Sequence, residues 1–270
     1  MYQRACVPHA PKRSMMMAYR ARRWMAGLGA TAAVGVAVLG QAGIAGAAVQ
    51  PSAAYLHLGS HGAAVKTLQQ RLAALHYYPG KIDGKFGWST MEAVWAFKEV
   101  QYGKRTPPHP NIVGPAMRRQ LKHPKLPKVH KPHGGAWRVE VNKNLEVLVV
   151  YKHSKVTLIS HVSTAAYSRP DGTGFVTPNG RYRALEYLAG AIPDSKYGGF
   201  LYNPVFFIGR SYAIHGMPNP TSTFSYDGVP LNPASHGCIR VPMSVSRVFH
   251  NYVHTSPTRG TPIYVFGRNN

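Results

Sequence analysis

A short segment in the middle of the chain, residues 122–135, contains almost nothing that a folded core could bury. It is rich in Lys, His and Pro. Proline favours extended backbone, and like charges extend such a segment further. Apolar residues recur at helical spacing before it and at alternate positions after it. We therefore expect a linker here, between a helical domain and a mainly β domain.

The helical domain is expected to span residues 56–121 and to contain three short helices. Four apolar residues fall on one face of the first helix: Val65, Leu68, Leu72 and Leu75. Ser89 and Glu92 have the spacing of a capping box at the start of the second helix. Pro115 suits the first turn of the third. This domain is predicted to be a small all-α, three-helix module.

The second domain is expected to span residues 136–268 and to be mainly β. Apolar residues alternate from Trp137 to Val162, with a hairpin turn at residues 142–144. Three later segments also have a strand pattern: Val205–Ile208, Tyr212–His215 and Ile263–Phe266. A helix is predicted around Ser244–Tyr252. The predicted fold class is therefore two-domain, all-α followed by mainly β.

Residues 1–48 have the three parts of a secretory signal. Arg20, Arg22 and Arg23 precede an uncharged run rich in Ala, Gly and Val, and small residues at 45–47 suit cleavage. The alternative is an uncleaved anchor, since the run reaches the lower length limit for a membrane span. We expect an exported, extracytoplasmic protein that contacts the membrane only if the signal is retained.

The net charge of +23 over 270 residues indicates an anionic partner. No nucleic-acid-binding motif is visible, and an exported protein rarely meets nucleic acid. Anionic polymers of the cell envelope are therefore the expected partners. The only two cysteines, Cys6 and Cys238, exclude a disulfide framework, and nine acidic residues are few for a carboxylate-rich metal site.

Two short motifs carry the residues best suited to chemistry. They are His215, Gly216, Ser235, His236, Gly237, Cys238 and Arg240. A neighbouring His can take the proton of a thiol and activate it as a nucleophile. A glycine beside the nucleophile lets backbone N–H groups approach a developing oxyanion, and Arg offers a planar fork for a carboxylate. These residues predict nucleophilic catalysis by Cys238.

Each of these residues also has a simpler interpretation. Cys238 could be a small core residue, and His215 a hydrogen-bonded core histidine. Arg240 could pair with a nearby acid. Cys238, His236 and His215 could bind zinc, but no acid or further Cys stands nearby to complete the set. No metal and no cofactor are expected.

The helical domain resembles the peptidoglycan-binding domain of cell-wall enzymes. The resemblance is carried by Leu58-Gly59-Ser60, by the apolar face of the first helix and by the Asp-Gly-x-Phe-Gly sequence at 83–87. Lys98 departs from the pattern, which usually has Gln after the Phe. The resemblance implies binding to the glycan of peptidoglycan, whereas the alternative is a helical spacer.

The second domain resembles the L,D-transpeptidase catalytic domain. That family has a His-Gly pair followed by Ser-His-Gly-Cys, and often an Arg two places later. Ser163-Thr164 and the Thr-Pro-x-Gly-x-aromatic sequence at 177–182 also match. Ala165 departs from the Gly that is common there. The segment from 217 to 233, between the two motifs, is long and is expected to form a lid.

The resemblance implies a cysteine acyltransferase acting on peptidoglycan stem peptides. Cys238 would attack the third residue of a tetrapeptide stem, with His215 as the base, oriented by the Gly216 carbonyl. The amides of Gly237 and Cys238 would hold the oxyanion, and His236 would shape the cleft. A second stem would resolve the thioester, giving third-to-third cross-links. Members of the family are acylated by carbapenem β-lactams.

Three alternatives remain open or are disfavoured. An L,D-carboxypeptidase would pass the same acyl group to water and trim tetrapeptides to tripeptides. A non-catalytic wall-binding protein would use the helical domain alone, which the intact His and Cys motifs disfavour. A serine D,D-transpeptidase is disfavoured because neither Ser-x-x-Lys nor Lys-Thr-Gly occurs in the chain.

Overall fold

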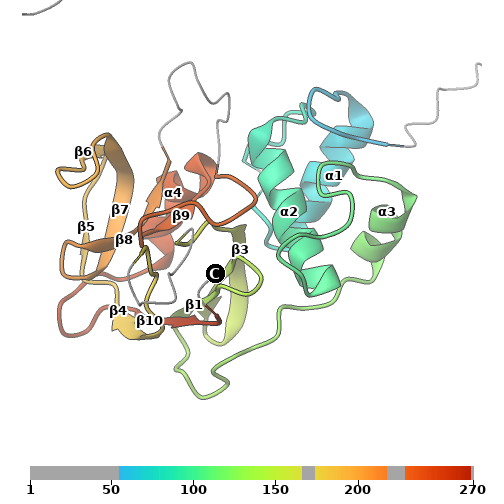
Figure 1. The fold of residues 1–270 in the computed structure, drawn as a ribbon. Helices are drawn as coiled ribbons and strands as arrows, with labels where there is room; N and C mark the ends of the chain where they lie inside the picture. The colour runs from blue at the N-terminus through green and yellow to red at the C-terminus, as the bar shows by residue number, and fades with distance from the viewer. Residues whose placement is uncertain (1–54, 79, 166–173, 218–228, 269–270) are drawn as a thin grey trace, which may run out of the picture. The chain divides into compact units, whose positions relative to one another are not determined.

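The computed structural model describes most of the chain after residue 54: residues 55–78, 80–165, 174–217 and 229–268 (Figure 1). The chain divides into two units, Met1–Val49 and Gln50–Asn270, and every described residue belongs to the second. The expected signal at 1–48 lies outside the described residues, as does most of the expected lid at 217–233. Within the described part, no helix is long and apolar enough to cross a membrane.

The first part of the fold contains three helices, α1 (Ala63–Ala74), α2 (Trp88–Tyr102) and α3 (Pro115–Lys122) (Figure 1). The predicted apolar face of α1 is confirmed: Val65, Leu68 and Leu72 are buried, and Leu75 packs against the same core. Pro115 lies in the first turn of α3, as predicted. The turn before α2 is held by Gln69, which accepts the Gly84 N–H at 2.8 Å and donates to Asp83 at 3.1 Å.

The predicted capping box at the start of α2 is wrong. The N-cap is Gly87, and no side chain caps the helix. The Glu92 side chain is 1% exposed, and its carboxylate accepts the backbone N–H of Val229 at 2.7 Å. Because this carboxylate points into the protein, it does not reach back to the first turn of its own helix.

The first sheet has five strands, β1 (Arg138–Asn142), β2 (Val147–Lys152), β3 (Lys155–His161), β4 (Gly180–Arg183) and β10 (Pro262–Phe266). Their order is β3-β2-β1-β10-β4. Neighbours are antiparallel except β1 and β10, which run parallel. The final strand of the chain therefore lies inside the sheet, between β1 and β4.

The second sheet contains β5 (Glu186–Tyr187), β6 (Ala191–Pro193), β7 (Phe200–Ile208), β8 (Tyr212–Gly216) and β9 (Ile239–Val241). Strand β7 pairs with β5, β6 and β8, and β8 pairs in parallel with β9. Helix α4 (Met243–Phe249) and a 3₁₀ turn at His250–Tyr252 follow, which confirms the helix predicted at 244–252. Helix α4 packs against β7 and β8.

Strand β2 separates two cores because both of its faces are apolar. Val147, Val149 and Tyr151 belong to a core that includes the helices, whereas Leu148 and Val150 belong to the core of the two sheets. Side chains alternate along a strand, so these two sets face opposite sides of the sheet. The helices therefore cover one face of the first sheet and share a core with it.

The segment between the helices and β1 has no helix or strand over residues 123–135, and most of its side chains are exposed. It is nevertheless held by specific hydrogen bonds. Gln101 of α2 bonds the backbone N–H of Lys125 at 2.8 Å and its carbonyl at 3.0 Å. Further along, the Glu140 carboxylate accepts the backbone N–H of His130 at 2.8 Å. The segment is thus fixed to both parts that it connects.

Candidate active site

Two neighbouring strands of the second sheet bring the predicted motifs together. Strand β8 ends with His215 and Gly216, and β9 begins directly after Cys238. The two strands are parallel, with His215 opposite Arg240. Side chains alternate along a strand, and paired residues of parallel strands point to the same face. His215 and Arg240 therefore point to the same face of the sheet. Cys238 immediately precedes β9, and its Sγ lies against Ala213 of β8, two residues before His215.

The Cys238 side chain is only partly buried, unlike an ordinary core cysteine. Its Sγ accepts the Ala213 N–H at 3.4 Å and lies 3.9 Å from the Ser211 carbonyl oxygen. Burial raises the pKa of the thiol, and the Ala213 hydrogen bond offsets this only in part. The resting group at neutral pH is therefore the thiol, and a nucleophilic attack needs a base that removes its proton.

His215 has the environment of such a base. Its side chain is buried, and its Nδ1 lies 2.8 Å from the Gly216 carbonyl oxygen. A carbonyl can only accept, so Nδ1 carries the proton of the neutral ring and Nε2 keeps its lone pair. Burial lowers the pKa of His215 to about 4, although the Gly216 hydrogen bond opposes the shift. The imidazole is therefore neutral at physiological pH and able to accept a proton.

Gly216 lets helix α4 pack directly on the backbone beside His215. A Cβ at this position would collide with Ser246 Oγ and would lie 2.7 Å from Met243 Sδ. Both residues belong to α4. This close packing fixes the peptide whose carbonyl orients the imidazole, and a larger residue would displace it.

The backbone around Cys238 is fixed by two hydroxyl groups. Ser235 Oγ donates to the Cys238 carbonyl at 2.6 Å and accepts the Gly237 N–H at 3.0 Å. Thr177 Oγ1 donates to the Gly237 carbonyl at 2.8 Å. The Gly237 N–H, expected to help hold an oxyanion, is thus already bonded to Ser235. Of the two amides expected to hold the oxyanion, this leaves the Cys238 amide as the candidate donor.

Gly237 is held in a conformation that other residues rarely adopt. Its φ is +136°, and a Cβ would lie 2.7 Å from Tyr212 Cε1 and 3.1 Å from the Val176 carbonyl oxygen. We expect Gly237→Ala to displace Cys238, to destabilise the fold by about 1–3 kcal/mol and to lower the acylation rate more than about tenfold.

The matched control for this variant is Gly190→Ala, because Gly190 also has a positive φ, +88°, but nothing lies within 4 Å of a Cβ there. Thermal unfolding and the carbapenem acylation rate, measured on both variants, check the prediction. Equal acylation rates would show that the crowding at Gly237 does not hold Cys238.

His236 lies at an exposed position and stacks on aromatic rings. Its ring is parallel to that of Tyr197, with centroids 4.2 Å apart, and Phe175 meets it edge-on at 4.2 Å. Burial lowers the pKa of His236, so the ring is mainly neutral at pH 7. Tyr197 and Phe175 are missed by the sequence analysis, because neither belongs to a motif and both lie far from His236 in the chain.

Arg240 points to the same face of the sheet as His215, its partner on β8. No carboxylate of the described residues forms an ion pair with it. Its backbone is paired with Ser163, with N–H to O distances of 2.9 Å and 3.0 Å. A guanidinium without an internal carboxylate is available for an anionic group of a substrate.

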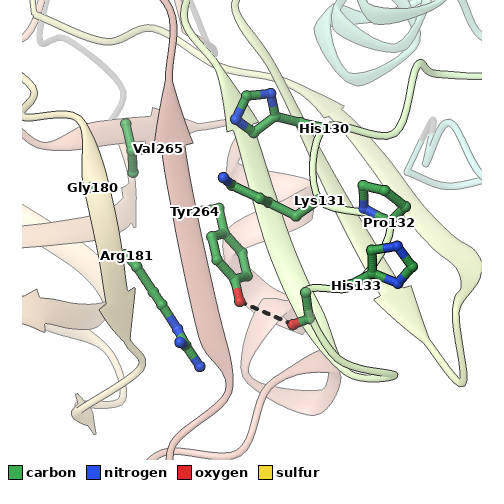
Figure 2. Close-up of a pocket in the computed structure, with 9 residues that line it drawn as sticks. His130, Lys131, Pro132, His133, Gly180, Arg181, Tyr264 and Val265 are labelled. Atoms are coloured by element: carbon green, nitrogen blue, oxygen red, sulfur yellow. Dashed lines mark hydrogen bonds between the residues drawn. The ribbon is translucent and has the colours of Figure 1, made fainter.

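A separate pocket of about 700 Å³ lies on the first sheet (Figure 2). It is lined by residues 130–134 of the connecting segment and by β4 and β10, and none of the seven candidate site residues lines it. The Tyr264 hydroxyl donates to the Gly134 carbonyl at 3.0 Å across it (Figure 2). Over the described residues, no three His, Cys, Asp or Glu side chains form a group that could hold a metal ion.

Comparison with known protein families assigns both parts of the fold. Residues 136–265 match the L,D-transpeptidase catalytic domain, and residues 61–103 match a peptidoglycan binding domain. The chain carries an L,D-transpeptidase catalytic domain. It follows an N-terminal helical peptidoglycan-binding domain, as the sequence resemblance predicted. Both domains act on peptidoglycan, so the protein works in the cell wall, outside the cytoplasm.

One solved structure supports this assignment. An L,D-transpeptidase from Xylanimonas cellulosilytica is 28% identical with a TM-score of 0.64, and the match covers 80% of this chain and 99% of that one. An L,D-transpeptidase from Stackebrandtia nassauensis is 20% identical with a TM-score of 0.41, over 79% and 96% of the two chains. The comparison with curated proteins finds no match.

Proposed function

We propose that the protein is a peptidoglycan L,D-transpeptidase that forms third-to-third cross-links through a thioester on Cys238. The observation that carries this proposal is the state of His215. Its Nδ1 is bonded to the Gly216 carbonyl, its ring is neutral, and it lies on β8, the strand whose Ala213 N–H bonds the thiol. The 28% identity to a solved L,D-transpeptidase over most of this chain supports the same activity.

In the first half-reaction, His215 Nε2 takes the Cys238 proton while Sγ attacks the carbonyl carbon of the third stem residue. The tetrahedral oxyanion is held by the Cys238 amide. His215 then returns the proton to the amine of the terminal D-Ala, the C–N bond breaks and a thioester remains. The thiol and the imidazole are both neutral at the start, so no charged group has to be formed before substrate binds.

In the second half-reaction, the side-chain amine of another stem attacks the thioester. His215 takes a proton from this amine, and the thiolate leaves and is reprotonated. Arg240 is suited to hold a stem carboxylate, because its guanidinium faces the site and is free of internal acids among the described residues. His236, stacked on Tyr197 and met edge-on by Phe175, forms an aromatic wall beside the motif.

The other parts of the chain bring the enzyme to its substrate. Residues 1–48 act as an export signal, and the helical domain holds the enzyme on glycan. The large excess of basic residues attracts the protein to anionic polymers of the envelope. Glycan binding and the attraction to anionic polymers both raise the local concentration of stem peptides around Cys238.

Product analysis distinguishes the transpeptidase from the carboxypeptidase, because amine and water enter the same thioester. We expect a purified disaccharide-tetrapeptide, incubated with the enzyme, to give dimers formed with loss of one D-Ala and joined between two third residues. Mass spectrometry identifies both products. Tripeptide monomers without dimers, even at high acceptor concentration, would assign the protein as an L,D-carboxypeptidase instead.

A further inference from the structure

The segment that leads into Cys238 has no regular secondary structure from residue 229 to 234, so hydrogen bonds from elsewhere must determine its path. Its second half is held by the residues after β3. Ser163 Oγ donates to the Asn232 carbonyl at 3.0 Å. The N–H groups of Ala234 and Ser235 donate to the Thr164 carbonyl at 3.1 Å and 2.9 Å. These contacts lie within the catalytic domain.

The first half of the same segment is held by the other domain. Glu92 of α2 accepts the Val229 N–H at 2.7 Å. Two turns further along α2, the two carboxylate oxygens of Glu99 lie 2.9 Å and 3.1 Å from His161 Nδ1. The other ring nitrogen of His161, Nε2, lies 3.1 Å from the Pro230 carbonyl oxygen. Two carboxylates of one helix therefore fix two consecutive residues of the segment, one directly and one through His161.

The charge state of His161 follows from its partners. A carboxylate faces one ring nitrogen and a carbonyl faces the other, and both groups accept hydrogen bonds. Burial disfavours the charged ring, but Glu99, the Pro230 carbonyl and Glu146 together outweigh it and raise the pKa of His161 to about 9. His161 is therefore an imidazolium that donates to both acceptors, and the side chains of His161 and Glu99 are fully buried.

The helices also pack on the first sheet through apolar contacts. Phe97 packs edge-on against Tyr77 at 5.3 Å, and both belong to the core that also contains Val149 and Ile159 of the first sheet. Apolar packing has no direction, whereas hydrogen bonds fix particular atoms. The buried carboxylates are a second set of contacts: Glu92 reaches the segment before Cys238 directly, and Glu99 reaches it through His161, the last residue of β3.

We propose that α2 of the peptidoglycan-binding domain is a positioning element of the active site, and that Glu92 and Glu99 are positioning residues for the segment that carries Ser235 and Cys238. The inference rests on the proposed role of Cys238 as nucleophile. It makes the helical domain more than a wall anchor, because a change in α2 would alter the position of the thiol.

The test compares four α2 variants of the full-length chain: Glu92→Ala, Glu92→Gln, Glu99→Gln and Gln101→Ala. Glu92→Ala removes the acceptor for the Val229 N–H, and Glu92→Gln keeps an oxygen at the same place. Gln101→Ala is the matched control, because Gln101 is equally buried on the same helix but bonds Lys125 of the connecting segment. Thermal unfolding of each variant measures the general loss of stability.

Amide hydrogen exchange, read by mass spectrometry on peptides that cover 229–240, measures the position directly and requires no enzyme activity. We expect Glu92→Ala to raise exchange there about tenfold or more, Glu92→Gln to stay within about threefold of the parent, and Gln101→Ala to leave this segment unchanged. Glu99→Gln, which removes the charge that holds His161, should act in the same direction as Glu92→Ala. Equal exchange in Glu92→Ala and Gln101→Ala would overturn the proposal.

Acylation by a carbapenem tests the consequence for the thiol. At saturating carbapenem, the acylation rate constant of Glu92→Ala is expected to fall about tenfold, with recovery in Glu92→Gln and no change in Gln101→Ala. A parent protein that is not acylated at all would contradict the proposed function, while the exchange result would still decide the positioning role.

Discussion

Replacement of Cys238 with Ala is expected to reduce cross-linking by a factor on the order of 10⁴ or more, because no other group can form the thioester. The fold should remain, since the thiol makes only a 3.4 Å contact with Ala213 and a 3.9 Å contact with Ser211. Thermal unfolding checks the fold, and product analysis checks the activity. More than a trace of activity in Cys238→Ala would exclude the thioester mechanism.

The same residue is expected to be the only site of carbapenem attachment. The strained β-lactam ring is opened by the sulfur, so intact-mass measurement should show one adduct, and peptide mapping should place it on Cys238. Cys238→Ala should show none. An adduct that persists in this variant, or that maps to a serine such as Ser235, would contradict the assignment.

Replacement of His215 with Ala is expected to lower the acylation rate by about 10²–10⁴, the usual contribution of a general base. The thiol pKa is raised by burial, so without His215 very little thiolate forms at neutral pH. A comparable change at His250→Ala, a histidine that stacks on Tyr187, should leave the acylation rate unaltered. Equal effects of the two variants would exclude His215 as the base.

The pH profile of the parent enzyme provides an independent check on His215. The reaction needs the neutral ring, and burial lowers the pKa of His215 to about 4. The acylation rate should therefore fall by only about one-tenth between pH 7 and pH 5, whereas with a histidine of the ordinary pKa of about 6.5 it would fall about 25-fold. An acid limb near pH 6.5 would contradict the buried, neutral base.

Much of the fold follows from hydrophobic periodicity. The first helix and strands β1, β2, β3, β7, β8 and β10 occur where the spacing of apolar residues predicts them, whereas this spacing does not predict the short strands β4, β5, β6 and β9. The start of α2 does not follow from sequence in this way. Ser89 and Glu92 have the spacing of a capping box, but the Glu92 carboxylate instead accepts the backbone N–H of Val229, 137 residues away. Local spacing contains no information about such distant partners.

The candidate site also contains residues that the sequence reveals and residues that it does not. Cys238 and His215 are recognisable because their motifs are short and contiguous, and the fold then brings them together through the parallel pairing of β8 and β9. Lys143 shows the opposite case: the sequence suggests an exposed hairpin turn, yet its side chain is buried and donates to the Thr177 carbonyl at 2.7 Å. A polar residue that is satisfied inside a protein looks in sequence like one at the surface.

The place of β10 inside the first sheet has a consequence for how the chain acquires its structure during synthesis. The antiparallel strands β1, β2 and β3 are consecutive and can pair as soon as they emerge from the ribosome. Strand β4 cannot join them until residues 262–266 arrive, because β10 separates β4 from β1. The first sheet of the catalytic domain therefore stays incomplete until residues 262–266 have been made, and a stop codon shortly before residue 262 would split this sheet although the entire Ser-His-Gly-Cys motif had been made.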